Sequence, residues 1–184
     1  MNEPAHYLIG EAARMELVVG NIVHETTDAI VNAANSSLLG GGGVDGAIHA
    51  AAGPTLLDEC RKIHDQRGPL PAGQAVATRA GNLKVRYVIH TVGPVWNGGK
   101  LGEDGLLASC YRRSLELCEQ YGLVSVAFPA ISTGIYRFPA DRAADIAVKT
   151  TADMLASVPA LSRVIFCCFS DDSARLHEAA MTRL

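Results

Sequence analysis

The 184-residue chain has no excess of basic residues, since 16 Lys and Arg stand against 19 Asp and Glu and the formal net charge is −3. Proteins that grip nucleic acid through its backbone need a basic surface, so we expect no nucleic acid partner, sequence-specific or otherwise. A small anion is still a feasible ligand, because backbone N–H groups alone can hold it. The chain is 48% hydrophobic and 19% charged, which indicates a folded domain and not a disordered chain.

The five cysteines form no Cys-x-x-Cys pair and are odd in number. We therefore expect neither a disulfide framework nor a metal site. Cys167 and Cys168 are neighbours in an apolar run typical of a strand, so their side chains should point to opposite faces of a sheet. Buried thiols of this kind are typical of proteins in a reducing cytoplasm.

No apolar run approaches the ~20 residues that cross a bilayer. The N-terminus also lacks the basic and apolar regions of a signal peptide. We expect a cytoplasmic protein that does not bind membranes. Residues 1–14 are predicted to form an N-terminal tail or an extra strand, and residues 15–184 a single domain.

Short segments rich in Val, Ile and aromatic residues alternate with longer segments of helical periodicity. The predicted strands are 15–19, 29–33, 74–79, 87–92, 125–128 and 164–169. The predicted helices are 47–52, 56–63, 106–121, 140–155 and 171–184. Asp171 or Ser173 is expected to cap the last helix. This alternation predicts an α/β fold with a largely parallel sheet covered on both faces.

Four consecutive glycines, residues 40–43, lie between the strand 29–33 and the helix 47–52. Glycine lets backbone N–H groups take unusual directions and lets a ligand come close. The helix start adds unpaired N–H donors and a partial positive charge. Together these features predict a phosphate-binding site.

Two known phosphate motifs do not account for this run. A P-loop needs Gly-Lys-Ser/Thr, whereas the run ends Val44-Asp45-Gly46. The dinucleotide motif G-x-G-x-x-G is matched by Gly41, Gly43 and Gly46, but residues 34–40 separate it from the strand 29–33. An acid inside the turn would also repel a pyrophosphate. A nucleotide-dependent oxidoreductase is therefore the weaker interpretation.

Asp45 has two compatible interpretations. It could cap a helix that begins at Gly46, or it could aim a carboxylate at a water or hydroxyl near the phosphate. His49 follows four residues later, shares the helix face of Asp45 and is a further catalytic candidate. Asn32 and Asn35 end the preceding strand. We favour a turn role for Asn32 and leave Asn35 open between a turn and a ligand contact.

A second loop, residues 129–139, also joins a strand to a helix and contains Gly-Ile-Tyr-Arg-Phe-Pro at 134–139. Residues 35–48 consist of Asn, six residues, Gly-Gly-Val-Asp, a small residue, an apolar residue and Ile. These two motifs resemble the signatures of the macrodomain family, in its MacroD-type branch. The flanking segments 28–35, 90–96 and 126–134 agree as well. The resemblance runs from about residue 16 to near the C-terminus.

The resemblance implies a three-layer α/β/α macrodomain over residues 15–184, with a central mixed, largely parallel sheet. It implies an ADP-ribose cleft at one sheet edge and no cofactor or metal. The implied enzyme is a hydrolase that cleaves esters at the distal ribose. It would remove mono-ADP-ribose from acidic side chains of proteins and deacetylate O-acetyl-ADP-ribose. The alternative is a reader module that binds ADP-ribose without hydrolysis.

By the same resemblance, Asp45 and the substrate phosphate would position a water, with Asn35 and Tyr136 as further catalytic residues. The implied ADP-ribose contacts are Asn21, Ile22, Ala33, Asn35, Gly42, Gly43, Val44, Asp45, Ser132, Thr133, Gly134, Ile135, Tyr136 and Phe169. Two positions depart from the family pattern. Asn21 replaces an Asp that binds the adenine amino group, so its bond would carry no charge. Arg137 replaces a glycine and would either favour an acidic protein substrate or narrow the entrance.

Overall fold

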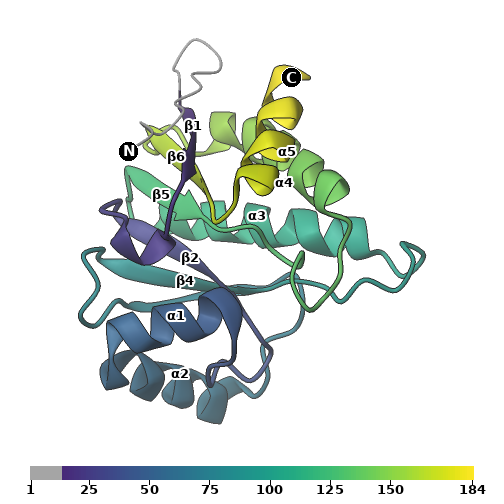
Figure 1. Ribbon diagram of the computed structural model, residues 1–184. Helices are drawn as coiled ribbons and strands as arrows, with labels where there is room; N and C mark the ends of the chain where they lie inside the picture. The colour runs from purple at the N-terminus through teal and green to yellow at the C-terminus, as the bar shows by residue number, and fades with distance from the viewer. Residues whose placement is uncertain (1–13) are drawn as a thin grey trace.

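The computed structural model describes residues 14–184 and is built on one six-stranded sheet (Figure 1). The strands are β1 (Met15–Val19), β2 (Ala29–Ala34), β3 (Ala75–Arg79), β4 (Tyr87–Val92), β5 (Ser125–Phe128) and β6 (Arg163–Cys168). Their order is β1-β6-β5-β2-β4-β3, and all neighbours are parallel except the antiparallel pair β3 and β4. Each strand lies within one residue of its predicted bounds, and the mixed, largely parallel sheet is confirmed.

Helices cover both faces of this sheet (Figure 1). On one face lie α1 (Gly43–Ala52) and α2 (Pro54–Arg67); on the other lie α3 (Glu103–Gln120), α4 (Ala140–Met154) and α5 (Asp171–Thr182). Two single-turn 3-10 helices, η1 (Ile22–His24) and η2 (Leu155–Ser157), were not predicted. The three-layer α/β/α architecture is confirmed. Within residues 14–184, no helix is long and apolar enough to span a bilayer.

The hydrophobic core has two parts, one on each face of the sheet. On the side of α3, Phe128 packs against Tyr111 with ring centroids 5.0 Å apart. Along each strand the side chains alternate between the two faces, so the residues next to those of the first part are buried on the side of α1 and α2. Cys168 belongs to the first part and Cys167 to the second, so their predicted opposite orientation is confirmed. All five cysteines are free and buried.

Local sequence sets several helix ends. Gly53, at φ +82°, separates α1 from α2, and Pro54 begins the second helix. This positive φ favours glycine, since a residue with a Cβ would be strained there and would also displace the Asn82 side-chain amide, 2.9 Å away. The prediction for the last helix was wrong about its cap. Ser170 caps α5 by accepting a bond from the Ser173 N–H at 3.2 Å, because its backbone is extended and Asp171 is already helical.

The parallel strands place five loops at one edge of the sheet. Strands β1, β6, β5, β2 and β4 all end there, since parallel neighbours share a direction. Two backbone bonds tie these loops together. The Gly20 N–H donates to the Cys168 carbonyl at 2.9 Å, and the Trp96 N–H donates to the Tyr136 carbonyl at 2.8 Å. Three strand spacings separate β1 from β2, which is about 14 Å.

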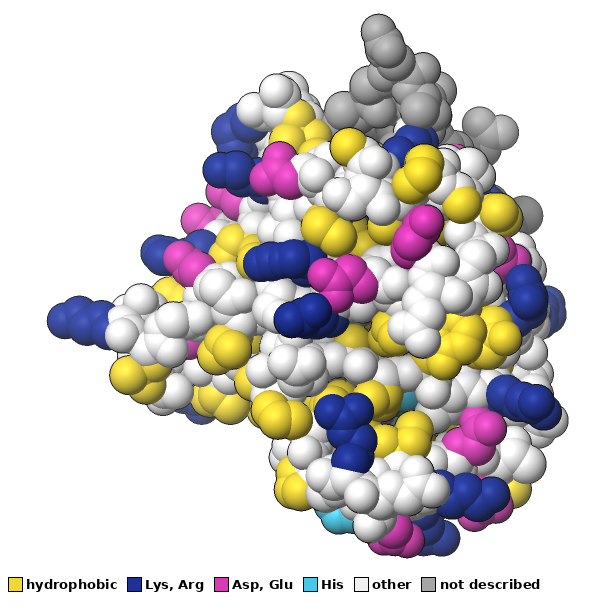
Figure 2. All heavy atoms as spheres, turned by 180° about the vertical axis from the view of Figure 1, so that it is seen from behind, with side chains coloured by type: hydrophobic (Ala, Val, Ile, Leu, Met, Phe, Trp, Pro, Cys, Tyr) yellow, Lys and Arg dark blue, Asp and Glu magenta, His cyan; other side chains and the backbone are white. Residues whose placement is uncertain are grey.

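Acidic and basic side chains are interspersed over the face of the molecule seen in Figure 2, and neither sign forms a continuous patch there. The prediction of a tail or an extra strand for residues 1–14 lies outside the described residues, apart from Arg14.

Candidate functional site

The glycine run forms a set of backbone donors at the start of α1. Gly42 is the N-cap of the helix, and Gly43 has φ +57°. Within residues 14–184, the N–H groups of residues 41–45 have no hydrogen-bond acceptor. These N–H groups and the positive end of the helix dipole form the arrangement that binds an anion. The sequence prediction of a donor-rich loop is thus matched by its geometry.

The loop after β5 supplies a second set of donors. Ser132 has φ +66°, and its buried hydroxyl has no partner within the described chain. A non-glycine residue in this region is strained, and such strain is concentrated at functional sites. No acceptor within residues 14–184 binds the N–H groups of residues 133–136. Because β5 pairs with β2, the two sets of donors lie at neighbouring strand ends.

Asp45 lies in the first turn of α1 and does not cap it. The expectation of a helix that begins at Gly46 with an Asp45 cap was wrong. The glycines themselves enter the helix, so that it begins at Gly43. Asp45 is 5% exposed and accepts a hydrogen bond from Asn32 Nδ2 at 2.8 Å through Oδ1. The side chain therefore points back towards the sheet and not along the helix start.

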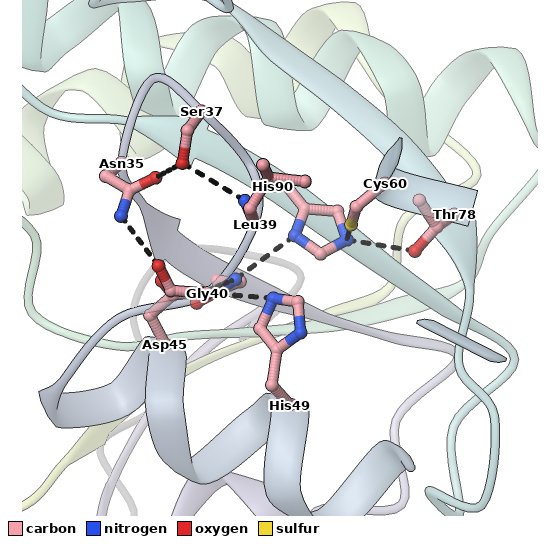
Figure 3. A network of polar contacts seen from close by, with 10 residues as sticks. Asn35, Ser37, Leu39, Gly40, Asp45, His49, Cys60, Thr78 and His90 are labelled. Carbon is pink, nitrogen blue, oxygen red and sulfur yellow. Dashed lines mark hydrogen bonds and ion pairs between the residues drawn. The ribbon is translucent and has the colours of Figure 1, made fainter. Parts of the chain in front are cut away.

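The turn role favoured for Asn32 was also wrong. Asn32 lies within β2, is fully buried, and contacts Asp45 and the ring of His90. The strand continues to Ala34, so the turn begins at Asn35. Asn35 accepts a bond from the Ser37 hydroxyl at 2.6 Å and donates one to the Gly40 carbonyl at 2.8 Å (Figure 3).

Asn35 and Asp45 meet above Gly41. A Cβ built on Gly41 would lie 3.1 Å from Asp45 Oδ2 and 3.2 Å from Asn35 Nδ2. A group at this point would therefore contact a carboxylate oxygen and an amide N–H together. Asp45 thus uses one oxygen inside the protein and turns the other towards Gly41. This geometry can orient a water or a hydroxyl beside the anion-binding N–H groups.

His49 lies on α1 with Asp45, whereas Tyr136 lies in the second loop. His49 Nε2 is 3.4 Å from Asp45 Oδ1, so the predicted shared helix face is confirmed. That oxygen is the one that Asn32 also binds, so His49 faces the same side of the carboxylate, although His49 Nε2 has no hydrogen-bond partner within the described residues. Tyr136 is half-buried in the second loop, and its carbonyl accepts the Trp96 N–H. Ile135, beside it, is 91% exposed.

His90, Thr78 and Cys60, which were not predicted as site residues, continue the network behind Asp45 (Figure 3). His90 Nδ1 is 3.1 Å from Asn32 Nδ2, and its Nε2 is 2.9 Å from Thr78 Oγ1. Burial lowers the pKa of His90 to about 3, and His49 adds to this effect. Burial also raises the pKa of the Cys60 thiol to about 12. A polar residue inside the apolar run 87–92 was the signal that could have pointed to His90.

Comparison with known proteins decides the family. The Macro domain family model matches residues 31–147. The chain belongs to the macrodomain family. It is 55% identical over 171 residues to a Citrobacter koseri protein named O-acetyl-ADP-ribose deacetylase, which covers 93% of this chain and 97% of that protein. The Escherichia coli K12 protein of the same name is 51% identical over 170 residues, with 92% and 96% covered.

Solved macrodomain structures share the fold. A variant of the Oceanobacillus iheyensis macrodomain with ADPR has a TM-score of 0.88 at 44% identity, and 92% of each chain is covered. The Trypanosoma brucei macrodomain in complex with ADP-ribose has a TM-score of 0.83 at 40% identity. That match covers 91% of this chain and 68% of the other.

Most of the remaining candidate residues of this macrodomain follow the ends of β1 and β6, at the same edge of the sheet. Phe169 follows β6 and is 86% exposed, whereas the Ile22 side chain is buried. Asn21 accepts the Val23 N–H at 3.2 Å, which uses one lone pair of its amide oxygen. Asn21 and Phe169 lie close together because β1 and β6 are paired to their last residues. Ala33 lies in β2 and is packed partly against the core.

In this macrodomain, residues 14–184 contain no cluster of three His, Cys, Asp or Glu side chains suited to a metal ion. The expected absence of a metal and a cofactor stays a prediction.

Proposed function

We propose that this macrodomain is an ADP-ribose-binding hydrolase that cleaves esters at the distal ribose. One observation carries the proposal: Asp45 Oδ2 and Asn35 Nδ2 converge at Gly41, beside two loops with unpaired N–H groups. A module that only binds ADP-ribose has no need of a buried carboxylate at this point. The relatives named O-acetyl-ADP-ribose deacetylase support the same conclusion.

In the proposed complex, the diphosphate lies between the two loops. The N–H groups of Gly42, Gly43 and Val44 bind it from one side, and those of residues 132–136 from the other. Charge-assisted bonds of this type contribute about 1.5–3 kcal/mol each, which is enough to hold a dianion without a lysine. The adenine would lie between Asn21 and Phe169, three strands away from Asp45.

The proposed reaction is the hydrolysis of an ester. Asp45 Oδ2 accepts a hydrogen bond from a water, and a phosphate oxygen of the substrate helps to take its proton. Asn35 binds the distal ribose, and Tyr136 closes over it. The ester C–O bond breaks, and water adds OH to one fragment and H to the other, giving a carboxylic acid and a ribose hydroxyl. Positioned general-base groups of this kind typically contribute 10²–10⁴-fold, by order of magnitude.

The proposed substrates share this bond. O-acetyl-ADP-ribose carries an acetyl ester on the distal ribose, and a mono-ADP-ribosylated acidic side chain is esterified to the same sugar. One positioned water serves both, so we propose that proteins carrying mono-ADP-ribose on Asp or Glu are substrates too.

Steady-state assays on O-acetyl-ADP-ribose and on a mono-ADP-ribosylated protein test the proposal. Asp45→Ala should lower kcat by about 100-fold or more on both substrates. Asp58→Ala, which removes the same group from an exposed position on α2, is the matched control and should leave kcat unchanged. If wild-type protein binds ADP-ribose in calorimetry but hydrolyses neither substrate, the protein is a reader module instead.

A further inference from the structure

A chain of buried polar contacts runs from Asp45 across the sheet to the edge strand β3. Asn32 Nδ2 donates to Asp45 Oδ1 at 2.8 Å and lies 3.1 Å from His90 Nδ1. His90 Nε2 in turn is 2.9 Å from Thr78 Oγ1 on the edge strand β3. Asn32 and His90 are fully buried, and they are side by side in register on β2 and β4. Figure 3 shows Asp45 and His49 rising from α1 towards the His90 ring.

The hydrogen bonds of the Asn32 amide determine which ring nitrogen of His90 carries a hydrogen. An amide nitrogen has two N–H donors, and here one faces a carboxylate while the other faces His90 Nδ1. Nδ1 must therefore carry a lone pair. The proton of the neutral ring is then on Nε2, which donates to Thr78 Oγ1. The Thr78 hydroxyl in turn donates a hydrogen bond to the Arg79 carbonyl at 3.0 Å.

The other polar groups around the ring are consistent with this tautomer. Cys60 Sγ, on α2, is 3.8 Å from His90 Nε2 and stays a neutral thiol because burial raises its pKa. His49, on α1, has its ring centroid 6.3 Å from that of His90. Desolvation and the nearby His49 both oppose protonation of His90, so its pKa is lowered. The carboxylates of Asp45 and Glu59 are the acidic groups near this cluster, where both add to the raised pKa of the Cys60 thiol. Asn32 contacts both Asp45 and the His90 ring, so it stands between them.

We propose that His90 is a positioning residue for Asp45: its Nε2–H tautomer, held by Thr78, orients the Asn32 amide. The oriented amide engages Asp45 Oδ1 and leaves Oδ2 free to face the substrate. This inference rests on the proposed function, because it assigns a purpose to the orientation of the carboxylate that we propose as the catalytic group.

The opposite tautomer would break the chain. A hydrogen on His90 Nδ1 would point at the N–H of Asn32, so the amide would turn its oxygen towards the ring. That oxygen would then also face Asp45 Oδ1, and two acceptors would oppose each other in a buried site. The carboxylate would rotate away from its present position, and Oδ2 would leave the point above Gly41.

Nitrogen-15 NMR of the uniformly labelled wild-type protein tests the tautomer without any substitution. We expect the chemical shifts of His90 to show a protonated Nε2 and an unprotonated Nδ1, unchanged across neutral pH. A hydrogen on Nδ1, or a charged ring at neutral pH, would overturn the proposal.

Two substitutions distinguish a positioning role of His90 from a role in packing alone. In His90→Asn, the amide oxygen reaches the place of Nδ1 and can still accept from Asn32. In His90→Gln, the amide reaches the place of Nε2 and keeps only the bond to Thr78. Both lose the ring, so both should lose similar thermal stability. We expect His90→Gln to lower kcat by about 10-fold or more, with KM and the Kd for ADP-ribose changed by less than about twofold. His90→Asn should retain kcat within about threefold.

Equal losses of kcat in the two variants, or full activity in His90→Gln, would show that the ring only packs. Thr78→Val provides a milder change that keeps the ring and removes its acceptor, and we expect a lower kcat with the Nε2–H resonance shifted or lost. Asp45→Ala, assayed beside these variants, separates the two proposals. If Asp45→Ala remains active, the proposed function fails; if it is inactive while His90→Gln and His90→Asn behave alike, only the role of His90 fails.

Discussion

Gly41→Ala tests the site without removing any polar group. The added methyl would stand 3.1 Å from Asp45 Oδ2 and 3.2 Å from Asn35 Nδ2, which is where we propose that the reacting water or ribose hydroxyl sits. Gly41 does not have a positive φ, so alanine is compatible with its backbone. The neighbours need to yield by only a few tenths of an ångström, and we expect the stability to change by less than about 1 kcal/mol.

The cost to catalysis should be much larger than the cost to stability. The methyl displaces a group that must lie within hydrogen-bond reach of both side chains, and a shift of about 1 Å in such a position costs about 100-fold in rate. We therefore expect kcat on O-acetyl-ADP-ribose to fall by about 100-fold. ADP-ribose should still bind, since the donors of the second loop are untouched.

The matched control is Gly105→Ala on α3, where an added Cβ meets nothing within 4 Å. It should leave kcat unchanged and raise the free energy of unfolding by about 0.5–1 kcal/mol, because alanine is the better helix former. Urea unfolding and steady-state kinetics on both variants are the measurements. If Gly41→Ala keeps kcat within about threefold of wild type, the reacting group does not occupy the space above Gly41 and the proposed geometry is refuted.

Three further predictions concern the supports of the fold and the cleft. The Arg14 side chain donates hydrogen bonds to three carbonyls in residues 155–161, at 2.5 to 2.7 Å. Arg14→Ala should therefore lower the free energy of unfolding, measured in urea, by about 2–4 kcal/mol and leave kcat unchanged. A loss below about 0.5 kcal/mol would contradict this prediction. Burial raises the pKa of Glu103, but N–H donors from residues 97–101 outweigh it and hold the pKa below its usual range. Ionised Glu103 thus stabilises the fold at pH values above its unfolded-state pKa, and this stabilisation is lost as the pH falls through its folded-state pKa. The destabilisation caused by Glu103→Gln should therefore vanish in acid. Equal destabilisation at neutral and acid pH would refute this prediction. Arg137 has φ +60°, and Arg137→Gly should therefore raise the free energy of unfolding by about 0.5–1 kcal/mol in urea, whereas a decrease would show that the arginine side chain stabilises the loop.

Much of the fold follows from local patterns. The six strands were predicted within one residue because each is a short apolar run bounded by polar or turn residues. Helix ends were predicted less well, since α1 begins within the glycine run, where propensity argues against a helix. A tertiary contact stabilises this first turn nonetheless, because Asp45 accepts a hydrogen bond from Asn32 in β2.

The candidate site, too, was predicted in part from the sequence and in part decided by tertiary contacts. By itself, the sequence determined which loops carry the donors and which residues are candidates, because the glycine run, the motifs at 35–48 and 134–139 and the family resemblance are local or linear features. Only the tertiary structure decided what each side chain does. Asn32 contacts a residue 13 positions away and His90 one that is 58 positions away, and no local pattern encodes such pairs. Asn32 and His90 are brought together because β2 and β4 pair in register, and the loops form one site because the parallel strands end at the same edge of the sheet.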